Sequence, residues 1–280
     1  MPNEMPYLSL PIVLVHGIFM RDDSRKAWGR IPLWLSEGGN AVFFAGTNAC
    51  SPVEVNAQIL ASTIERICSL RQVNAVHLIG FSRGGLDARC CAELYGQSGH
   101  IASITTLCTP HAGSFVARNG FALLPDFAVR SISYAAKWRA RSLGDLRPDA
   151  FRVFCDLSSS NASECNLDIS EPLLEEGIYC QSYALASARP CRFCFAKPVG
   201  PDDIPNDGLV ATRSATWQNY KGSFYTTAPS VINVKHDDMV DAHRRRIRLA
   251  IRRPDGLTHE VGDLRNAWCV IINDLKEAFE

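Results

Sequence analysis

The sequence predicts an α/β fold, a mostly parallel sheet with helices on both faces. Apolar strand-like runs alternate with helical patterns over the first 110 residues, as expected for parallel strands joined by crossover helices. The first run, residues 11–17, is apolar through Val15 and ends in His16-Gly17, which is typical of a central strand buried on both faces. A Gly-x-Ser-x-Gly sequence then connects a later strand directly to a helix. These observations together favour one large α/β domain over residues 1–280.

The order of the remaining elements follows from the same patterns. We expect strands at residues 11–17, 41–44, 73–81, 101–109, 177–184 and 230–234. Ser51-Pro52-Val53-Glu54 has the residues of a capping box, with serine as N-cap and proline at the first helical position, so a helix is expected to begin there. A last helix from about Asp263 carries an apolar stripe that should pack on the sheet, made of Leu264, Trp268, Ile271, Leu275 and Phe279.

Residues 115–172 are predicted to form a helical lid or cap insertion. The stretch contains no convincing strand, and its apolar residues are interleaved with arginines and a lysine without one clean face. One interpretation is a helical cap that completes the core. The other is a lid over an apolar substrate pocket, and we favour it because of the residues described next.

Ser82 lies in the Gly-x-Ser-x-Gly sequence, between an apolar strand and a helical pattern. Gly80 and Gly84 are what a very tight strand-to-helix turn requires, because a Cβ would collide with the neighbouring backbone. The alternative is an ordinary glycine-rich turn. A serine hydroxyl is a weak nucleophile, so a catalytic interpretation also requires a base and a group that orients it.

Two later residues are candidates for those partners, in the order serine, acid, histidine. Asp207 lies in the turn sequence Asn-Asp-Gly, and His236 follows the strand expected at residues 230–234. A plain turn aspartate and a surface histidine are the structural alternatives. The backbone N–H groups of Ile18 and Arg83 are candidate donors to an oxyanion, because one follows His16-Gly17 and the other follows the candidate nucleophile.

Five motifs of the chain resemble those of bacterial triacylglycerol lipases in the α/β-hydrolase superfamily, most of all a leaderless clostridial- and Proteus-like subgroup. They occur in that family's order: PIVLVHG from Pro11, GFSRGGLDAR from Gly80, TPHAGS from Thr109, NDGLV from Asn206 and HDDMV from His236. The resemblance implies an α/β-hydrolase fold with Ser82 as nucleophile, Asp207 as acid and His236 as base. It also implies an oxyanion hole at Ile18 and Arg83, and only a structural role for His111.

The chain departs from this family in two places. Phe81 stands where the family usually has histidine before the nucleophile. Many relatives hold a structural calcium ion with two aspartates near the histidine loop. Asp238 matches one of them, and only Asp202 or Asp203 are candidates for the other. We therefore expect no required cofactor and leave a structural calcium open.

The balance of charges indicates no highly charged partner. Lys plus Arg and Asp plus Glu number 29 each, so the composition suggests neither a nucleic-acid nor a membrane-charge partner. The basic run at residues 243–253 is interpreted as a solvated helix face, with an anionic lipid or nucleic-acid contact as the alternative. The eleven cysteines are expected to be reduced and mostly buried.

We see no signal peptide and no transmembrane segment, so a cytoplasmic location is expected, with leaderless export left open.

The function expected is hydrolysis of carboxylic esters with apolar acyl chains, by a lipase or carboxylesterase that forms an acyl-enzyme. A thioesterase, phospholipase or acyltransferase with the same three residues is the first alternative. The second is a non-catalytic scaffold that binds acyl ligands or a protein partner. The oligomeric state is not predicted.

Overall fold

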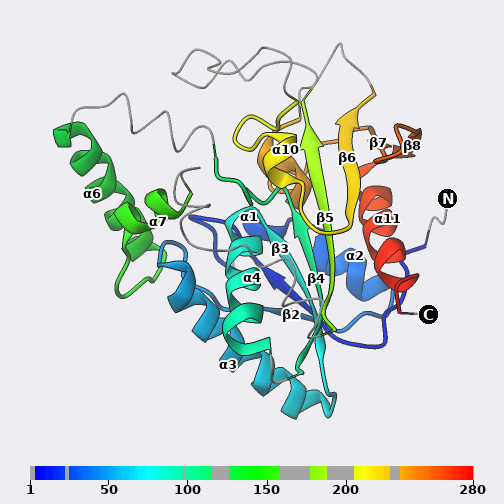
Figure 1. The fold of residues 1–280 in the computed structure, drawn as a ribbon, viewed down its shortest axis with the longest axis horizontal. Helices are drawn as coiled ribbons and strands as arrows, with labels where there is room; N and C mark the ends of the chain where they lie inside the picture. The colour runs from blue at the N-terminus through cyan, green and yellow to red at the C-terminus, as the bar shows by residue number, and fades with distance from the viewer. Residues whose placement is uncertain are drawn as a thin grey trace.

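One sheet organises the described part of the chain. The computed structural model describes residues 4–22, 25–96, 99–114, 126–157, 177–187, 205–227 and 234–279. Within these ranges eight strands lie in the order β2-β1-β3-β4-β5-β6-β7-β8 (Figure 1). Strands β1 to β6 pair in parallel, and β7 and β8 are antiparallel. Their bounds are β1 Ile12–Val15, β2 Val42–Phe44, β3 Val76–Phe81, β4 Ile101–Leu107, β5 Tyr179–Ala186, β6 Tyr220–Thr226, β7 Leu249–Arg252 and β8 Thr258–Gly262.

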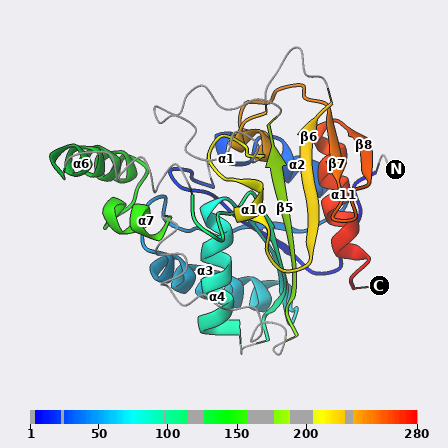
Figure 2. The ribbon, with the colours of Figure 1, turned by 45° about the horizontal axis from the view of Figure 1, so that its top comes forward.

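Helices cover both faces of this sheet. Helices α1 (Arg25–Trp28), α2 (Ile31–Glu37) and α11 (Leu264–Lys276) lie on one side, and α3 (Val53–Arg71) and α4 (Arg83–Tyr95) on the other (Figures 1 and 2). The alternation of side chains along a strand explains this division. Ile12 and Leu14 belong to the first apolar cluster, whereas Val13 and Val15 belong to the second. The continuous apolar run at residues 11–15 is thus a strand buried on both faces, as predicted.

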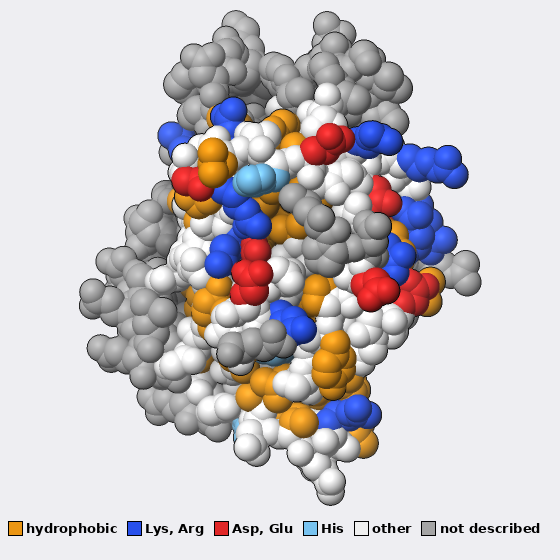
Figure 3. Space-filling model, turned by 90° about the vertical axis from the view of Figure 1, so that its right-hand side faces the viewer, with side chains coloured by type: hydrophobic (Ala, Val, Ile, Leu, Met, Phe, Trp, Pro, Cys, Tyr) orange, Lys and Arg blue, Asp and Glu red, His pale blue; other side chains and the backbone are white. Residues whose placement is uncertain are grey.

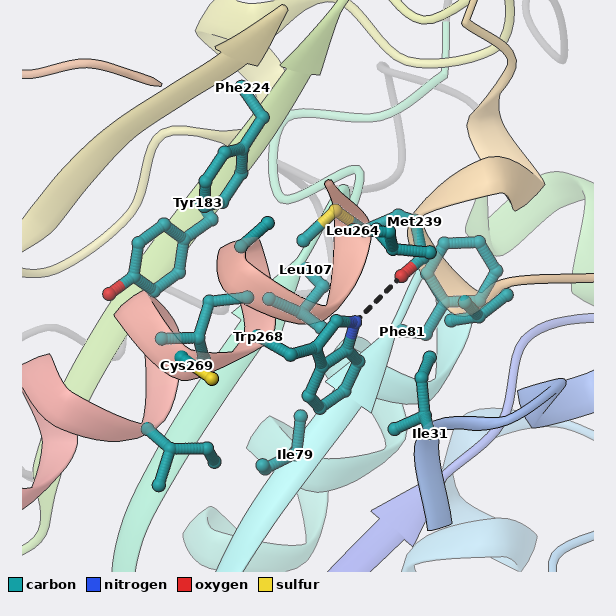
Figure 4. Packing of buried hydrophobic residues seen from close by; sticks show 14 of the residues in the cluster. Ile31, Ile79, Phe81, Leu107, Tyr183, Phe224, Met239, Leu264, Trp268 and Cys269 are labelled. Atoms are coloured by element: carbon teal, nitrogen blue, oxygen red, sulfur yellow. Dashed lines mark hydrogen bonds between the residues drawn. The ribbon is translucent and has the colours of Figure 1, made fainter. Parts of the chain in front are cut away.

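The first apolar cluster is centred on Trp268 of α11. The Trp268 side chain is fully buried and lies near Ile79, Phe81 and Leu107 (Figure 4). Its indole N–H donates to the backbone oxygen of Met239 at 3.0 Å. A buried indole N–H needs such a partner, since leaving it unpaired would cost about 1–3 kcal/mol. The α11 stripe predicted from the sequence therefore packs on the sheet and also contacts the loop around Met239.

The predicted functional residues lie together at one edge of the sheet, where the parallel strands have their carboxyl ends. Gly17 and Ile18 follow β1, Ser82 follows β3, and His236 lies in the 3-10 helix η2 (His236–Val240) beyond β6. Asp207 lies in the segment after β5, which is joined to the end of that strand by Ser187 N–H donating to Asn206 O at 2.7 Å. Ligand sites of open α/β sheets lie at this edge.

The predicted insertion at residues 115–172 contains two helices in its described part, α6 (Asp126–Ser142) and α7 (Ala150–Asp156). They lie at the far left in Figure 1, where α7 is next to the start of α3 and α6 is next to α7. Residues 115–125 and 158–172 lie outside the described residues. The boundaries of the insertion, its role as a lid and the single domain over residues 1–280 stay predictions.

The predicted capping box at the start of α3 is wrong. Pro52, with ψ of 152°, is the N-cap residue, and no side-chain hydrogen bond caps the helix. Ser51 is buried, and its backbone oxygen instead accepts a hydrogen bond from the guanidinium of Arg83. The tertiary contact thus fixes Ser51 outside the helix.

The basic run is not a helix face. Its end forms β7, whose Leu249, Ala250 and Ile251 are buried between β6 and β8. Three of its arginines form ion pairs: Arg245 with Asp238 at 2.9 Å, Arg248 with Glu260 at 3.9 Å and Arg253 with Asp274 at 2.5 Å. Basic and acidic side chains are intermixed on the face that carries α11, β7 and β8 (Figure 3).

Strand β6 was not predicted, because its sequence, YKGSFYT, carries no apolar run. The strand expected at residues 230–234 lies mostly outside the described residues, and its last residue, Val234, is not in a strand. None of the helices in the described ranges is long and apolar enough to cross a membrane.

Candidate active site

Ser82 occupies a strained turn between β3 and α4. Its φ is 54° and its ψ is −127°, a backbone conformation that non-glycine residues rarely adopt. The turn is this tight because β3 and α4 approach closely. A Cβ on Gly80 would lie 2.6 Å from Gly85 Cα, and a Cβ on Gly84 would collide with the backbone oxygens of Val15 and His16. Glycine at both predicted positions therefore allows Ser82 to stand at the end of the strand.

His236 and Asp207 form a buried hydrogen-bonded pair. His236 Nδ1 lies 2.6 Å from Asp207 Oδ2, and both side chains are less than a tenth exposed. The other oxygen, Oδ1, accepts the backbone N–H groups of Leu209 at 2.9 Å and Val210 at 2.8 Å. Because the carboxylate can only accept, His236 carries its proton on Nδ1 and leaves Nε2 free to take another.

His236 lies next to the serine turn, because its ring packs against the ring of Phe81. The Phe81 ring lies 4.8 Å from the His236 ring, centroid to centroid, and Phe81 directly precedes Ser82. No hydrogen bond joins Ser82 Oγ to His236 in the described structure, and bonds of this kind are often long before substrate binds. The aromatic ring that replaces the expected histidine thus packs against the candidate base.

Cys108 contacts this pair, and sequence reasoning missed it. Its Sγ, an oxygen of Asp207 and a ring nitrogen of His236 all lie within 4.8 Å of one another. Burial raises the pKa of the Cys108 thiol well above its ordinary value, and the Asp207 carboxylate raises it further. The raised pKa keeps the thiol protonated, so it can donate to Asp207.

The two expected oxyanion donors flank Ser82. Gly17 packs so closely that a Cβ on it would lie 3.2 Å from Ser82 Cβ, which places the neighbouring Ile18 beside the serine. Arg83 is the first residue of α4, where backbone N–H groups have no acceptor within the helix. The arrangement can therefore present both N–H groups to an oxygen bound at Ser82.

The side chain of Arg83 is also buried, a feature that the sequence did not predict. Its Nη2 lies 3.2 Å from Asp87 Oδ1 and donates to Ser51 O. Asp87 also accepts a hydrogen bond from Asn56 at 2.9 Å. Burial raises the pKa of Asp87 to about 6, although Arg83 and Asn56 lower it. A buried ion pair thus lies directly behind one of the expected oxyanion donors.

Three contacts hold the η2 loop that carries His236. The carboxylate of Asp241 accepts from the backbone N–H of Arg30 at 2.9 Å and from its guanidinium at 2.7 and 2.9 Å. Asp238 Oδ2 accepts from Arg245 at 2.9 Å and from the N–H of Lys235 at 2.9 Å. The third contact is the Trp268 hydrogen bond to Met239. Each contact comes from a different part of the chain.

Asp238, the expected calcium ligand, does not fit a calcium ion. The Arg245 guanidinium already supplies positive charge to its buried carboxylate. The other metal-binding groups nearby are Asp237 and His243, which pair with each other at 2.9 Å, and calcium prefers a cage of oxygen ligands. Asp202 and Asp203 lie outside the described residues.

His111 has a structural environment. Its Nδ1 accepts from Arg89 at 2.7 Å, its Nε2 lies 3.0 Å from Thr106 Oγ1, and its ring stacks on Trp217 at 4.7 Å. Burial lowers the pKa of His111 well below its ordinary value, and the charge of Arg89 lowers it further. A neutral His111 therefore braces the loop after β4 against the segment that follows α10 (Thr212–Ala215).

Relatives of known activity match part of the chain. Over 111 residues it is 37% identical to a triacylglycerol lipase of Pseudomonas fragi, covering 38% of this chain and 36% of that protein. It is 32% identical to a triacylglycerol lipase of Pseudarthrobacter phenanthrenivorans, covering 37% and 34%. The matched part thus spans about a third of the length of these relatives. A family model described as palmitoyl protein thioesterase matches residues 11–142.

Solved structures match most of the chain. A lipase of Bacillus licheniformis in its mature form has a TM-score of 0.59 at 18% identity, covering 87% of this chain and 91% of that chain. A metagenomic carboxyl esterase has a TM-score of 0.64 at 14% identity, covering 100% and 79%. The chain has the α/β-hydrolase fold. The predicted fold class and the resemblance to bacterial triacylglycerol lipases are confirmed, and the subgroup stays a prediction.

Replacement of Asp207 tests the acid assignment. In Asp207→Asn we expect the amide oxygen to accept from Leu209 and Val210, so that the N–H₂ group faces His236 Nδ1 and selects the wrong tautomer. The kcat on an ester should then fall by about 10³–10⁴-fold. Asp237→Asn is the matched control, because Asp237 is next to His236 in sequence but pairs with His243 at the surface. We expect it to change kcat by less than about threefold. Full activity of Asp207→Asn, with loss in Asp203→Asn or Asp237→Asn, would assign the acid elsewhere.

Proposed function

We propose that this chain is a serine hydrolase that cleaves carboxylic esters of apolar acyl chains through an acyl-enzyme. The observation that carries the proposal is the buried His236–Asp207 pair, with its Nδ1–Oδ2 distance of 2.6 Å, beside the strained turn of Ser82. A strained serine next to an oriented imidazole matches the chemical requirement for an activated hydroxyl nucleophile. In this proposal Ser82, His236 and Asp207 form a catalytic triad.

The reaction begins when His236 Nε2 takes the proton of Ser82 Oγ as that oxygen attacks the ester carbonyl. The Asp207 carboxylate stabilises the imidazolium through the Nδ1 hydrogen bond. The imidazolium then protonates the leaving alcohol. The same imidazole then takes a proton from water as the water oxygen attacks the acyl-enzyme. The acyl–Oγ bond breaks, the acid is released, and the imidazolium returns the proton to Ser82 Oγ.

The N–H groups of Ile18 and Arg83 stabilise the negative oxygen of each tetrahedral intermediate. Their positions on either side of Ser82 support this role. One such donor contributes about 2.7–4 kcal/mol to the transition state in hydrolases of this kind. The buried Arg83–Asp87 ion pair keeps the first turn of α4 in place.

The similarity to triacylglycerol lipases favours long-chain oxyesters as substrates. A thioesterase is the second candidate, because the palmitoyl protein thioesterase model matches the part of the chain from before β1 to the end of α6. Both activities use the same acyl-enzyme. They differ in the leaving group, since a thiolate needs less assistance from His236 than an alcohol does.

Residues 115–172 act in this proposal as a lid that meets a lipid surface. On α6 the side chains of Tyr134 and Trp138 are 73% and 69% exposed, one helical turn apart. Arg139 and Arg141 are exposed beside them. Exposed aromatic and basic side chains on one helix suit the boundary between lipid and water.

No metal takes part in the proposed reaction, and Arg245 stabilises the histidine loop in place of calcium. The Arg245 guanidinium compensates the buried charge of Asp238, which a calcium ion would otherwise do. The cytoplasmic location and the lack of a nucleic-acid partner stay predictions from the sequence.

A series of p-nitrophenyl esters from acetate to palmitate tests the activity. We expect kcat/KM to rise with chain length, by up to about fourfold per methylene buried. Ser82→Ala should lower kcat by at least about 10⁴-fold. Ser62→Ala, a change at an exposed serine on α3, should leave kcat unchanged. Turnover that does not depend on Ser82, or no turnover of any ester, would favour the binding scaffold.

Faster turnover of palmitoyl thioester than of palmitoyl ester would favour the thioesterase.

The lid proposal predicts faster hydrolysis at an interface. The rate on a short triacylglycerol should rise more steeply once its concentration exceeds its solubility and droplets form. Tyr134→Ser with Trp138→Ser should reduce this rise, whereas Leu70→Ser, which changes an exposed apolar residue on α3, should not. A rate that follows a single saturation curve through the solubility limit would contradict a lid.

Chelation tests the role of Arg245. We expect EDTA to leave both ester hydrolysis and the midpoint of urea unfolding unchanged. Arg245→Ala should lower the free energy of unfolding by about 1–3 kcal/mol, because it leaves the buried Asp238 without its charged partner. Arg246→Ala, at an exposed neighbour, is the control. Loss of activity in EDTA that calcium restores would show that a metal is required.

A further inference from the structure

Asp145, in the connection between α6 and α7, accepts two hydrogen bonds from a loop that lies much earlier in the chain, residues 47–51. Its carboxylate is 5% exposed. Oδ1 accepts the backbone N–H of Ala49 at 2.9 Å, and Oδ2 accepts the N–H of Cys50 at 2.7 Å. A buried carboxylate that accepts two consecutive backbone N–H groups is held by charge-assisted hydrogen bonds and fixes both peptide units.

The loop that Asp145 holds, residues 47–51, contacts both sides of the expected oxyanion hole. On one side, Phe19 N–H donates to Ala49 O at 2.9 Å, and His16 Nε2 lies 3.0 Å from Thr47 O. These two residues flank Gly17 and Ile18. Ile18 N–H, which lies between them, is therefore positioned by the 47–51 loop.

On the other side, the guanidinium of Arg83 donates to Ser51 O. Arg83 supplies the second expected oxyanion donor through its own backbone N–H. One short loop thus contacts the residues on both sides of Ser82, and Asp145 is the buried charge that fixes the middle of that loop.

Further contacts join the same part of the insertion to these loops. Asp149 N–H donates to Cys50 O at 2.9 Å, and the guanidinium of Arg21 donates to Leu143 O. Residues 143–149 therefore meet both the 47–51 loop and the loop that carries Ile18.

We infer that Asp145 is a positioning residue, which sets the oxyanion hole through the 47–51 loop and couples the α6–α7 insertion to the chemistry at Ser82. The inference rests on the proposed hydrolase function. Asp145 touches no reacting atom. It acts by fixing the loop whose displacement would move the N–H groups of Ile18 and Arg83, and a shift of about 1 Å at such a site can cost about 100-fold in rate.

Asp145→Asn is the direct test, because it keeps the volume but turns an amide N–H₂ toward one of the two N–H donors. We expect kcat on a p-nitrophenyl ester to fall by about 10–100-fold, with KM changed less than about threefold. The affinity for an alkyl boronic acid, which forms a tetrahedral adduct on serine, should fall by a similar factor as kcat/KM. The pH profile should keep its shape, because Asp207 and His236 are unchanged.

Asp149→Asn is the matched control. Asp149 lies in the same segment and caps α7 by accepting the N–H of Arg152 at 3.3 Å, whereas its side chain, unlike that of Asp145, accepts no hydrogen bond from the 47–51 loop. We expect its kcat and its boronate affinity to equal those of the wild type. An Asp145→Asn protein with wild-type kcat would overturn the inference, and so would one whose kcat falls while boronate affinity is unchanged.

Hydrogen exchange in the wild type gives a second test that does not depend on a variant that folds. Binding of the boronate should protect the amides of residues 47–51 and those of residues 143–149 together. Protection at residues 47–51 without any at residues 143–149 would overturn the coupling. A wild type that neither hydrolyses esters nor binds boronate would instead mean that the proposed function itself has failed.

Discussion

The hydrogen bond between His236 Nδ1 and Asp207 Oδ2 is the contact around which the rest of the site is arranged. A buried imidazole and carboxylate stay together only if both are fixed, since each has a large cost of desolvation. Asp207 is fixed by the N–H groups of Leu209 and Val210. His236 is fixed by its loop, which Arg30, Arg245 and Trp268 hold from three directions. The packing of α11 on the sheet therefore also determines where the candidate base lies.

Buried charged side chains also fix the backbone on the other side of Ser82, away from His236. The Arg83–Asp87 pair and the Asp145 carboxylate fix the backbone around the expected oxyanion donors. A preorganised oxyanion hole needs N–H groups that do not reorient during the reaction. Hydrogen bonds to a few buried side chains hold together three backbone segments that are remote in sequence, namely residues 16–19, 47–51 and 143–149.

The sequence predicted the elements whose patterns are local. The apolar strands β1, β3 and β4, the glycine turn at Ser82 and the stripe of α11 follow from the periodicity and from turn chemistry. The pairing of Asp207 with His236 agrees with the order of motifs along the chain. Strands β6, β7 and β8 were missed, because β6 and β8 are rich in polar residues and arginines flank β7. The buried roles of Cys108, Arg83 and Asp145 could not be predicted, since each depends on contacts with residues distant in sequence, which only the fold brings together.

In the proposed triad, Ser82 is a nucleophile that the His236–Asp207 pair activates. The first measurement is to treat the protein with an alkyl fluorophosphonate, a reagent for activated serines, and to locate the adduct by peptide mass spectrometry. We expect a single adduct on the peptide that contains Ser82, absent in Ser82→Ala and formed far more slowly in His236→Ala. An adduct on another serine, or a folded protein that does not react at all, would contradict it.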